Sequence, residues 1–209
     1  GSAASSRIGS YATFGANLAS TPFASDWAAT DALGNVVAFT GYDASDVDVT
    51  ATIAGASVNS LRFNTTAGEV TSGSIALPAN GGILITSNYS AGTPIGAGVG
   101  VSAASGDLII HNFASGDVTF AGDISGTNVV FSGTGRTLLT GTNTHSAVNY
   151  LGGSGTVSVQ DINKLGAGSL SFNGGTLEFS ASGVSLPTTS ANSLTRNIVL
   201  GSAGGTIQV

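Results

Sequence analysis

The sequence contains no cysteine and no methionine among its 209 residues. Without cysteine the chain forms no disulfide, no zinc–thiolate site and no cysteine nucleophile. This absence is compatible with secretion in bacteria, where large surface β-proteins are stabilised by long strand ladders instead of crosslinks. Without methionine the chain does not start at a native start codon, so Gly1-Ser2 is either a cloning remnant or the start of a processed or excised fragment.

Charge is also scarce, at 8% of residues against roughly 25% in an ordinary globular domain. The surface must therefore consist of Ser, Thr, Asn and Gly, which suits an extracellular protein or one packed against copies of itself. The net charge is −6, and the few basic residues are scattered: Arg7, Arg62, Arg136, Lys164 and Arg196. They form no basic stripe, so nucleic acid is a poor partner. No run of about 18 apolar residues is present, so we expect no membrane insertion by a helix.

Short strands are what the sequence does contain. Apolar residues alternate with polar ones and are interrupted every few residues by Gly or Asn, which is typical of β-structure. The clearest runs are 83–85, 108–110, 118–120, 129–131, 157–159, 170–172 and 177–179. One short helix is expected, around Ser25–Leu33 with Trp27.

An internal repeat indicates how these strands are arranged. The pattern Gly-Thr-apolar-x-apolar recurs with Thr156, Thr176 and Thr206, and a weaker copy contains Thr137, so the threonines are spaced by 19, 20 and 30 residues. A step near 20 fits one coil of a β-solenoid, in which each coil contacts only its neighbours. The longest step contains Ser180–Arg196, which we interpret as a loop inserted between coils. We predict an all-β chain folded as a β-solenoid.

The stretch LGAGSLSFNGGTLEF (165–179) allows a test of this prediction. By local rules Asn173-Gly174-Gly175 is a hairpin turn. In a solenoid it is instead a corner, and Asn173 is placed to stack as an amide ladder if neighbouring coils carry amides there. The solenoid requires Leu177 to pair in parallel near Val157 and Ile207, and not antiparallel with Leu170.

The chain divides into three parts by pattern. Residues 1–20 are expected to form a flexible leader or cap, and residues 21–130 the N-terminal coils of the solenoid. Residues 131–209 carry the clear repeats. Because Val209 falls within a strand pattern, we expect the array to continue beyond it.

These repeats resemble a known family. LGAGSLSFNGGTLEF, NIVLGSAGGTIQV (197–209) and FSGTGRTLLTGTNTHSAVNYLGGSGTVSVQDINKLG (131–166) are similar to the autotransporter-associated β-strand repeat. Stretches upstream, such as VNSLRFNTTAG and GDLIIHNFASGDVTFAGDISG, resemble the region that precedes such repeats. The resemblance implies a right-handed parallel β-helix in a secreted or surface-displayed bacterial protein. It also implies a structural or adhesive role, usually without catalytic residues.

The best candidate site is the acidic group Asp43, Asp46 and Asp48 in YDASDVDVT. Asp46 and Asp48 alternate with valines, so both carboxylates should project from one face of a strand. Three close carboxylates could coordinate Ca²⁺ through oxygen. The preferred interpretation is an acidic solvent face opposite two buried valines, because neither the EF-hand loop nor the glycine-aspartate nonapeptide is matched.

Other candidate sites have less support than this aspartate group. Asp107, Asp117 and Asp123 each follow glycine and are best interpreted as turn residues. His111 and His145 are the only histidines, and His111 is interpreted as an edge residue bonded to backbone. No nucleophile elbow accompanies them. Paired carboxylates for glycoside cleavage would have to come from a chain with only Glu69 and Glu178 as glutamates, and Glu178 is expected to point outward.

We therefore predict a protein that is not an enzyme and needs no cofactor, calcium being the one alternative. It is a structural or adhesive β-solenoid segment located outside the bacterial cell or on its outer surface, whose partners are itself or cell-surface and matrix components. The first alternative is a subunit of an extracellular filament assembled end to end. The second is a carbohydrate-binding or polysaccharide-cleaving β-helix, which a row of exposed aromatic residues would favour; Trp27, Tyr42, Tyr89 and Tyr150 are too scattered in sequence to show one.

Overall fold

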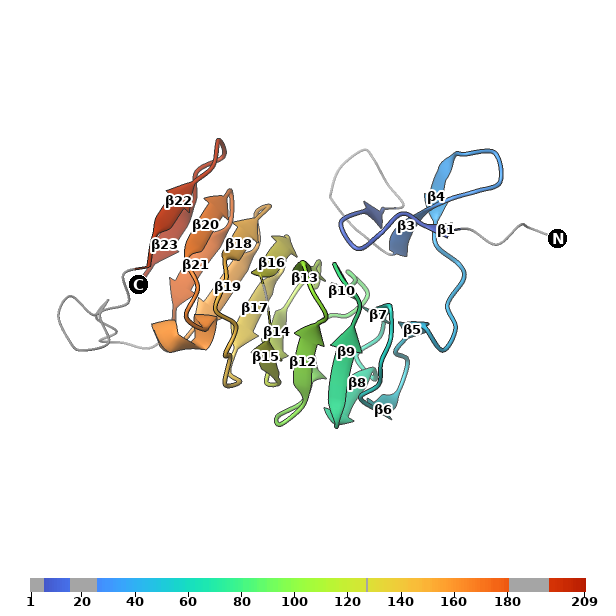
Figure 1. The fold of residues 1–209 in the computed structure, drawn as a ribbon, viewed down its shortest axis with the longest axis horizontal. Coiled ribbons are helices and arrows are strands. Elements are labelled where there is room, and N and C mark those ends of the chain that lie inside the picture. The colour runs from blue at the N-terminus through green and yellow to red at the C-terminus, as the bar shows by residue number, and fades with distance from the viewer. Residues whose placement is uncertain (1–5, 16–25, 127, 181–195) are drawn as a thin grey trace.

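The computed structural model of the chain describes residues 6–15, 26–126, 128–180 and 196–209. Regular structure in these residues is almost entirely β-strand, and the one helical element described is a 3-10 turn, η1, at Ile162–Leu165. Figure 1 shows an elongated stack of short strands with a smaller sheet beside it. The predicted all-β class is confirmed. In the described residues no helix is long and apolar enough to cross a membrane.

Two parallel sheets of eight strands run along the stack. The first sheet contains β5 Asp46–Asp48, β7 Ser60–Phe63, β10 Gly82–Ile85, β13 Asp107–Asn112, β16 Asn128–Gly133, β18 Asn149–Gly152, β20 Leu170–Asn173 and β22 Ile198–Leu200. The second sheet contains β6 Thr52–Ala54, β8 Glu69–Ser72, β11 Gly92–Ile95, β14 Asp117–Phe120, β17 Arg136–Leu139, β19 Thr156–Val159, β21 Thr176–Phe179 and β23 Thr206–Gln208.

A third sheet is shorter and contains β9 Ser74–Leu77, β12 Gly100–Ala103 and β15 Asp123–Ser125. Consecutive strands of these sheets fall in different sheets, and each strand inside a sheet pairs in parallel with the strand one coil earlier and the strand one coil later. This arrangement is consistent with the predicted β-solenoid, and we call residues 46–180 and 196–209 the solenoid region. All seven apolar runs singled out in the sequence lie in its strands.

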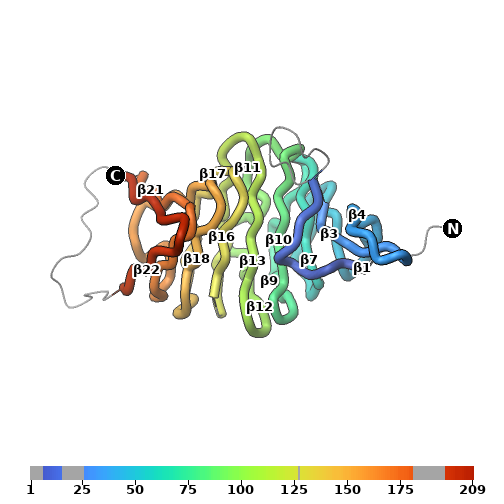
Figure 2. Tube along the Cα trace, turned by 90° about the horizontal axis from the view of Figure 1, so that it is seen from above, coloured from blue at the N-terminus to red at the C-terminus, as the bar shows by residue number. Residues whose placement is uncertain are grey.

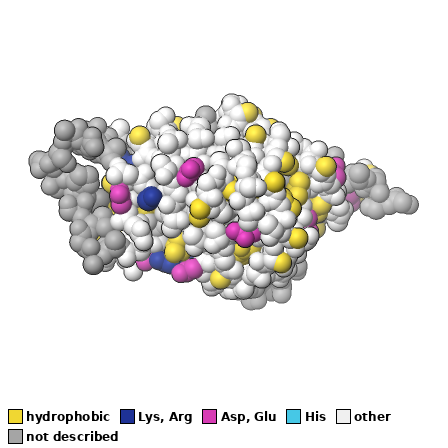
Figure 3. All heavy atoms as spheres, turned by 90° about the horizontal axis from the view of Figure 1, so that it is seen from below, with side chains coloured by type: hydrophobic (Ala, Val, Ile, Leu, Met, Phe, Trp, Pro, Cys, Tyr) yellow, Lys and Arg dark blue, Asp and Glu magenta, His cyan; other side chains and the backbone are white. Residues whose placement is uncertain are grey.

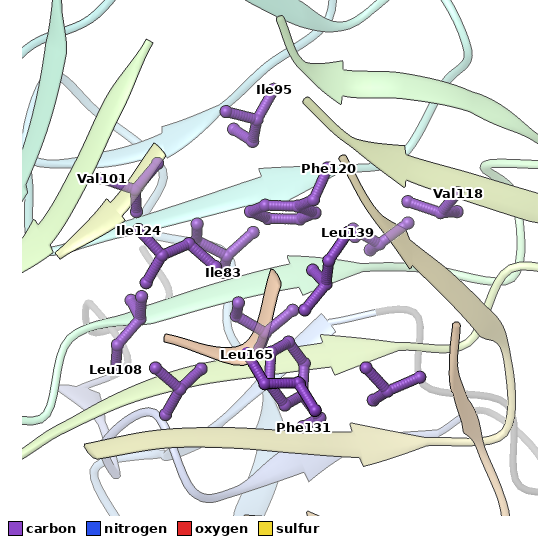
Figure 4. Close-up of a cluster of buried hydrophobic side chains, with 14 of the residues drawn as sticks. Ile83, Ile95, Val101, Leu108, Val118, Phe120, Ile124, Phe131, Leu139 and Leu165 are labelled. Atoms are coloured by element: carbon purple, nitrogen blue, oxygen red, sulfur yellow. The ribbon is translucent and has the colours of Figure 1, made fainter. Parts of the chain in front are cut away.

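The core is a column of inward-facing side chains. In the first sheet Leu61, Ile83, Ile110, Phe131, Leu151 and Phe172 follow one another in register. Figure 4 shows how residues of all three sheets, among them Val101, Phe120 and Phe131, converge between the strands. Because side chains alternate between the two faces of a strand, the period-two pattern puts these residues inside and their polar neighbours outside.

The register confirms the predicted pairing of Leu177. It pairs in parallel with Val157 on one side and Ile207 on the other, whereas Leu170 pairs with Asn149 and Ile198. The threonines Thr156, Thr176 and Thr206 occupy one register row. The 30-residue step in the sequence is therefore one coil, although residues 181–195 of its expected loop lie outside the described residues.

Thr137 is an exception to the predicted repeat. It lies opposite Val157, and Arg136 takes the place opposite Thr156, so the step here is 20 residues and not 19. Thr137 is thus in the inward row with Val118, Val157 and Leu177. Its hydroxyl accepts a hydrogen bond from Asn112 Nδ2 at 3.0 Å, which satisfies the polar group in this buried position.

The Asn173-Gly174-Gly175 stretch is a corner between β20 and β21. Gly174 has a φ of +101°, a conformation that favours glycine. Asn173 pairs with Gly152, so no amide lies opposite it in the coil below, and the suggested amide ladder is not formed there. Its Oδ1 instead accepts the backbone N–H of Ala203 at 3.2 Å, which ties the corner to the next coil.

The N-terminal residues form a separate antiparallel sheet, which we call the flap (residues 6–15 and 26–39). It contains β1 Ser6–Arg7, β2 Thr13–Phe14, β3 Asp26–Thr30 and β4 Val36–Ala38, with β3 pairing with the other three. The helix expected around Ser25–Leu33 is wrong, because Asp26–Thr30 is this strand. Residues 26–45 of the expected N-terminal coils thus precede the parallel sheets, which begin at β5.

The flap packs sideways on the solenoid region. Trp27, Ala29 and Phe39 form a small core with Leu84, whose side chain points out of β10. A Cβ added at Gly82 would overlap Ser10 and Trp27, so the flap approaches the sheet there as closely as glycine allows. Figure 2 shows the first flap segment crossing over β10 and β7.

Candidate functional site on the outer face of the first sheet

The outer face of the first sheet carries several of the residues considered above, among them Asp46, His111 and Tyr150. Register places one outward row along the stack, made of Asp46, Ser60, Gly82, Ile109, Val130, Tyr150, Ser171 and Val199. The flap covers the first part of this row, where Ile109 is fully buried. Beyond it Tyr150 is 38% and Val199 55% exposed, so the row emerges into solvent.

Asp46 and Asp48 lie under the flap and are engaged by arginines. Asp46 forms an ion pair with Arg7 Nε at 3.1 Å and accepts a hydrogen bond from Ser60 Oγ at 2.6 Å. Arg62 donates to both oxygens of Asp48, from Nε at 2.9 Å and from NH2 at 2.7 Å. Asp46 and Asp48 do lie on one face of β5, as predicted, but this face is covered by the flap and is not exposed to solvent. We call the ion-paired group of Arg7, Asp46, Asp48 and Arg62 the seam.

Asp43 does not join them in a metal site. Its Oδ1 accepts the backbone N–H groups of Asp46 and Ser45, and these hydrogen bonds lower the pKa of its carboxyl group. In the part of the chain that the structure describes, no three His, Asp or Glu side chains gather as metal ligands. The arginines hold carboxylate oxygens that Ca²⁺ would need, so the residues of this seam do not fit the calcium alternative.

Arg62 is the centre of the seam. Besides Asp48 it contacts Asp26 of the flap, and its guanidinium lies 4.2 Å from the ring centroid of Tyr42. The Tyr42 hydroxyl donates to Asp26 at 3.2 Å, and burial raises the pKa of Tyr42. Sequence reasoning missed this cluster because its members come from three separate segments.

The two histidines are structural. The Nε2 of His111 lies 2.8 Å from the carbonyl oxygen of Ser10, so its backbone partner belongs to the flap and not to a coil edge. His145 is buried in the segment between β17 and β18, where its Nε2 lies 2.8 Å from Asn149 Oδ1. Burial lowers the pKa of both histidines. Their described hydrogen-bond partners are a backbone carbonyl and an amide, and not the Ser and Asp side chains of a Ser-His-Asp triad.

Glu178, Asp117 and Asp123 have structural partners as well. Glu178 points outward, as expected, and shares Arg136 with Asp117, with shortest distances of 2.7 Å to each. Asp123 accepts the backbone N–H of Thr142 at 2.6 Å. Two carboxylates that share one guanidinium form a structural ion pair across coils, and they do not flank a space for a glycosidic bond.

A groove opens where the flap ends. It has a volume of about 300 Å³ and lies beside Tyr11, Asp107, Ser132, Tyr150, Ser171 and Asn173. Tyr11 comes from the flap and donates a hydrogen bond to Asp107, whose other oxygen accepts from Asn128 Nδ2 at 2.8 Å. Partial burial and the hydrogen bond to Asp107 raise the pKa of Tyr11 to about 12.

No pattern in the sequence links Tyr11 with Tyr150. Tyr11 lies in the expected leader, far from Tyr150 along the chain, and only the folding back of the flap brings them to one groove. Comparison with known protein families, with curated proteins and with solved structures finds no match to this chain.

Proposed function

We propose that this chain is a structural or adhesive segment of a secreted or surface-displayed bacterial protein, folded as a right-handed parallel β-helix. The single observation that carries the proposal is the pair of eight-stranded parallel sheets, stacked in register around one apolar column. In such a stack each coil contacts only its neighbours, so length is added without changing the fold. Right-handedness follows the strong preference of parallel crossover connections.

The surface supports an extracellular role. Figure 3 shows only scattered charged side chains on the face it presents, most of which is uncharged. The ion pairs of the described residues join different strands or coils, such as Arg136 with Glu178. The charges thus crosslink coils and are not arranged as a basic surface for nucleic acid. The resemblance of residues 131–209 to autotransporter-associated repeats agrees with this assignment.

Surface exposure is the decisive test. Antibodies raised against the folded chain should label intact cells of the organism that makes it, and mild external protease should remove the label. Labelling that requires cell lysis would contradict the proposal. Beads coated with the chain, compared with beads coated with heat-unfolded chain, would then separate an adhesive role from a purely structural one.

End-to-end assembly into a filament is a second candidate, favoured by the last coil. Strands β22 and β23 each pair on one side only among the described residues. Their side chains are exposed, with Leu200 at 64% and Ile207 at 43%. Unpaired edges with apolar side chains are templates for strand addition by another copy.

Electron microscopy of the purified chain tests the filament directly. Ordered fibres that disappear in the Leu200→Lys variant would support it, since a lysine on the edge opposes pairing. The control is Leu33→Lys, at an exposed position of the flap remote from this edge. Isolated rods in the unsubstituted protein at all accessible concentrations would exclude end-to-end assembly.

A further inference from the structure

We propose that the groove between Tyr11 and Tyr150 binds a neutral saccharide. The groove lies on the uncovered half of the outer row of the first sheet, directly beside the flap. Its volume of about 300 Å³ is at the lower end of the range of small-molecule sites, roughly 300–1,000 Å³. This inference does not depend on the structural role proposed above, because a scaffold needs no ligand.

Two tyrosine rings supply the apolar surface. Tyr11 is 57% exposed and Tyr150 38% exposed, and they reach the groove from the flap and from β18. A pyranose ring presents C–H groups on one face and hydroxyl groups around its rim. Tyrosine has the complementary shape, with an apolar ring and a polar tip that remains hydrated. Val130, paired in register with Tyr150, adds apolar surface to the floor.

Polar groups around these rings match the rim of a sugar. Asp107 is held by Tyr11 and Asn128 through one hydrogen bond to each oxygen. A carboxylate accepts up to about four hydrogen bonds, so further acceptor positions remain for sugar hydroxyls. Ser132 and Ser171 contribute hydroxyl groups, and the amide nitrogen of Asn173 can donate while its oxygen binds Ala203 N–H.

The charge of the lining selects neutral sugars. One carboxylate, that of Asp107, lies in the groove, and none of the described residues that line it is Lys, Arg or His. An acidic polysaccharide would bring like charge to Asp107 with no cation to pair with, and this repulsion is added to that of a chain with net charge −6. A neutral saccharide carries neither penalty.

A protein partner fits the groove less well. It is bounded by the outer face of a sheet and not by an unpaired strand edge, so strand addition cannot occur there. Stable protein interfaces bury about 1,200 Å² or more in total, which calls for a broad surface and not a groove of this size. A second copy of the chain on this face is nevertheless measured as an outcome below.

The experiment titrates the whole folded chain with neutral hexasaccharides of glucose, galactose, mannose, xylose and N-acetylglucosamine, with oligogalacturonate as the acidic probe. Calorimetry gives the affinity, and NMR signals of the Tyr11 and Tyr150 rings report the site. The variants are Tyr150→Ala, Tyr150→Phe and Leu33→Ala, the last at an 87% exposed position outside the groove. Circular dichroism and urea unfolding verify that each variant is folded.

We expect at least one neutral hexasaccharide to bind with a Kd of about 1 mM or tighter and to shift both ring signals. Tyr150→Ala should weaken it by about tenfold or more, as loss of a central aromatic anchor does at interfaces. Tyr150→Phe keeps the ring and should stay within about threefold, and Leu33→Ala should match the unsubstituted chain.

Four results would overturn the proposal: no binding of any neutral probe, binding that Tyr150→Ala leaves unchanged, preference for oligogalacturonate, or self-association that Tyr150→Ala abolishes. The NMR titration of the unsubstituted chain decides the matter even if Tyr150→Ala fails to fold. None of these results bears on cell-surface exposure, so failure here is distinguishable from failure of the structural role.

Discussion

The solenoid region closes its third side in two different ways. In residues 46–126, the three-sheet region, the third side is a ladder of β9, β12 and β15. In residues 128–180 and 196–209, the two-sheet region, no described strand continues that ladder. Its place is taken by the segment from Thr140 to Val148 and by η1, the 3-10 turn that Asp161 caps by accepting the N–H of Asn163.

Polar side chains replace the missing ladder. Asn143 accepts the backbone N–H of Ile124 at 2.8 Å and donates to the carbonyl of Lys164 at 2.6 Å, which joins β15 to η1. The guanidinium of Arg196 donates to backbone carbonyls around η1, among them that of Gly168 at 2.9 Å. Backbone groups that lack a ladder partner need such donors and acceptors, since leaving them buried and unpaired is costly.

What the two regions share is the apolar column, and not the third ladder. Ile124 in β15 and Leu165 in η1 are both fully buried in the same core. A strand and a 3-10 turn therefore serve the same purpose, which is to cover the third side of the column.

Truncation of the two matched core residues should have the largest effect. Ile124→Ala and Leu165→Ala each leave a cavity, and each should lower the free energy of unfolding by about 2–5 kcal/mol. Urea unfolding followed by circular dichroism measures both. Leu33→Ala is the control, with a change below about 0.5 kcal/mol expected for an exposed side chain. A Leu165→Ala variant as stable as this control would show that η1 does not cover the column.

Removal of the link between the regions should come next. Asn143→Ala leaves the Ile124 N–H and the Lys164 carbonyl without their side-chain partner, so it should cost about 1–3 kcal/mol. Asn163→Ala, at an exposed position of η1, provides the matched control with little expected change. Hydrogen exchange should also show faster exchange of the Ile124 amide in Asn143→Ala. Unchanged protection of that amide would contradict the role given to Asn143.

Acidification should lower the free energy of unfolding, and each of the two regions contributes one histidine to this effect. His111 lies in the three-sheet region and His145 in the two-sheet region, and burial lowers the pKa of both. Below about pH 6.5 the unfolded chain binds protons that the folded chain resists, so stability is present above that pH and is lost as pH falls. The slope is at most about 1.4 kcal/mol per pH unit for each histidine.

Urea unfolding at intervals between pH 7.5 and about 5.5, above the titration of ordinary carboxylates, measures this slope. His111→Gln and His145→Gln should each flatten it in part, and the double variant should flatten it most. Stability that is constant or that rises on acidification would refute the assignment of two buried neutral histidines.

The smallest effect is expected at Arg136, which spans the two regions. It pairs with Asp117 in β14 and Glu178 in β21 on the outer face of the second sheet. Hydrogen bonds to Glu178 and Asp117 raise the pKa of Arg136, but its side chain is 30% exposed. Arg136→Gln should therefore cost only about 0–1 kcal/mol, less at high salt. A loss as large as that of Leu165→Ala would mean that the ion pairs, and not the column, hold the coils together.

Much of the solenoid region could be predicted because its signal is local and repeated. Period-two alternation identifies Leu170, Phe172, Leu177 and Phe179 as inward, and the recurrence of Thr156, Thr176 and Thr206 sets the register. The predicted place of Thr137 in the repeat is wrong, because this threonine lies in the inward row. A threonine is acceptable there since its hydroxyl accepts a hydrogen bond from Asn112. Sequence spacing alone does not reveal such a compensating hydrogen bond.

The flap was harder to predict. Asp26–Thr30 contains two alanines and no alternation, a composition that is compatible with helix. Pairing with three neighbouring strands overrides that preference. One usable signal was the Asp31–Asn35 segment, where Asp31 Oδ1 accepts the N–H groups of Leu33 and Asn35 and Gly34 has a φ of +83°. An aspartate followed by glycine in this way is typical of a turn between strands.

Alternation and repeat length are enough to specify the strand content, the parallel stacking and the apolar column, because they act within each coil and between adjacent coils. What covers the column and the outer face of the first sheet depends instead on tertiary contacts. The flap seals Asp46 and Asp48 against Arg7 and Arg62, and it carries Tyr11 to Tyr150. These contacts join segments far apart in the chain, and no periodic pattern encodes them because each forms once.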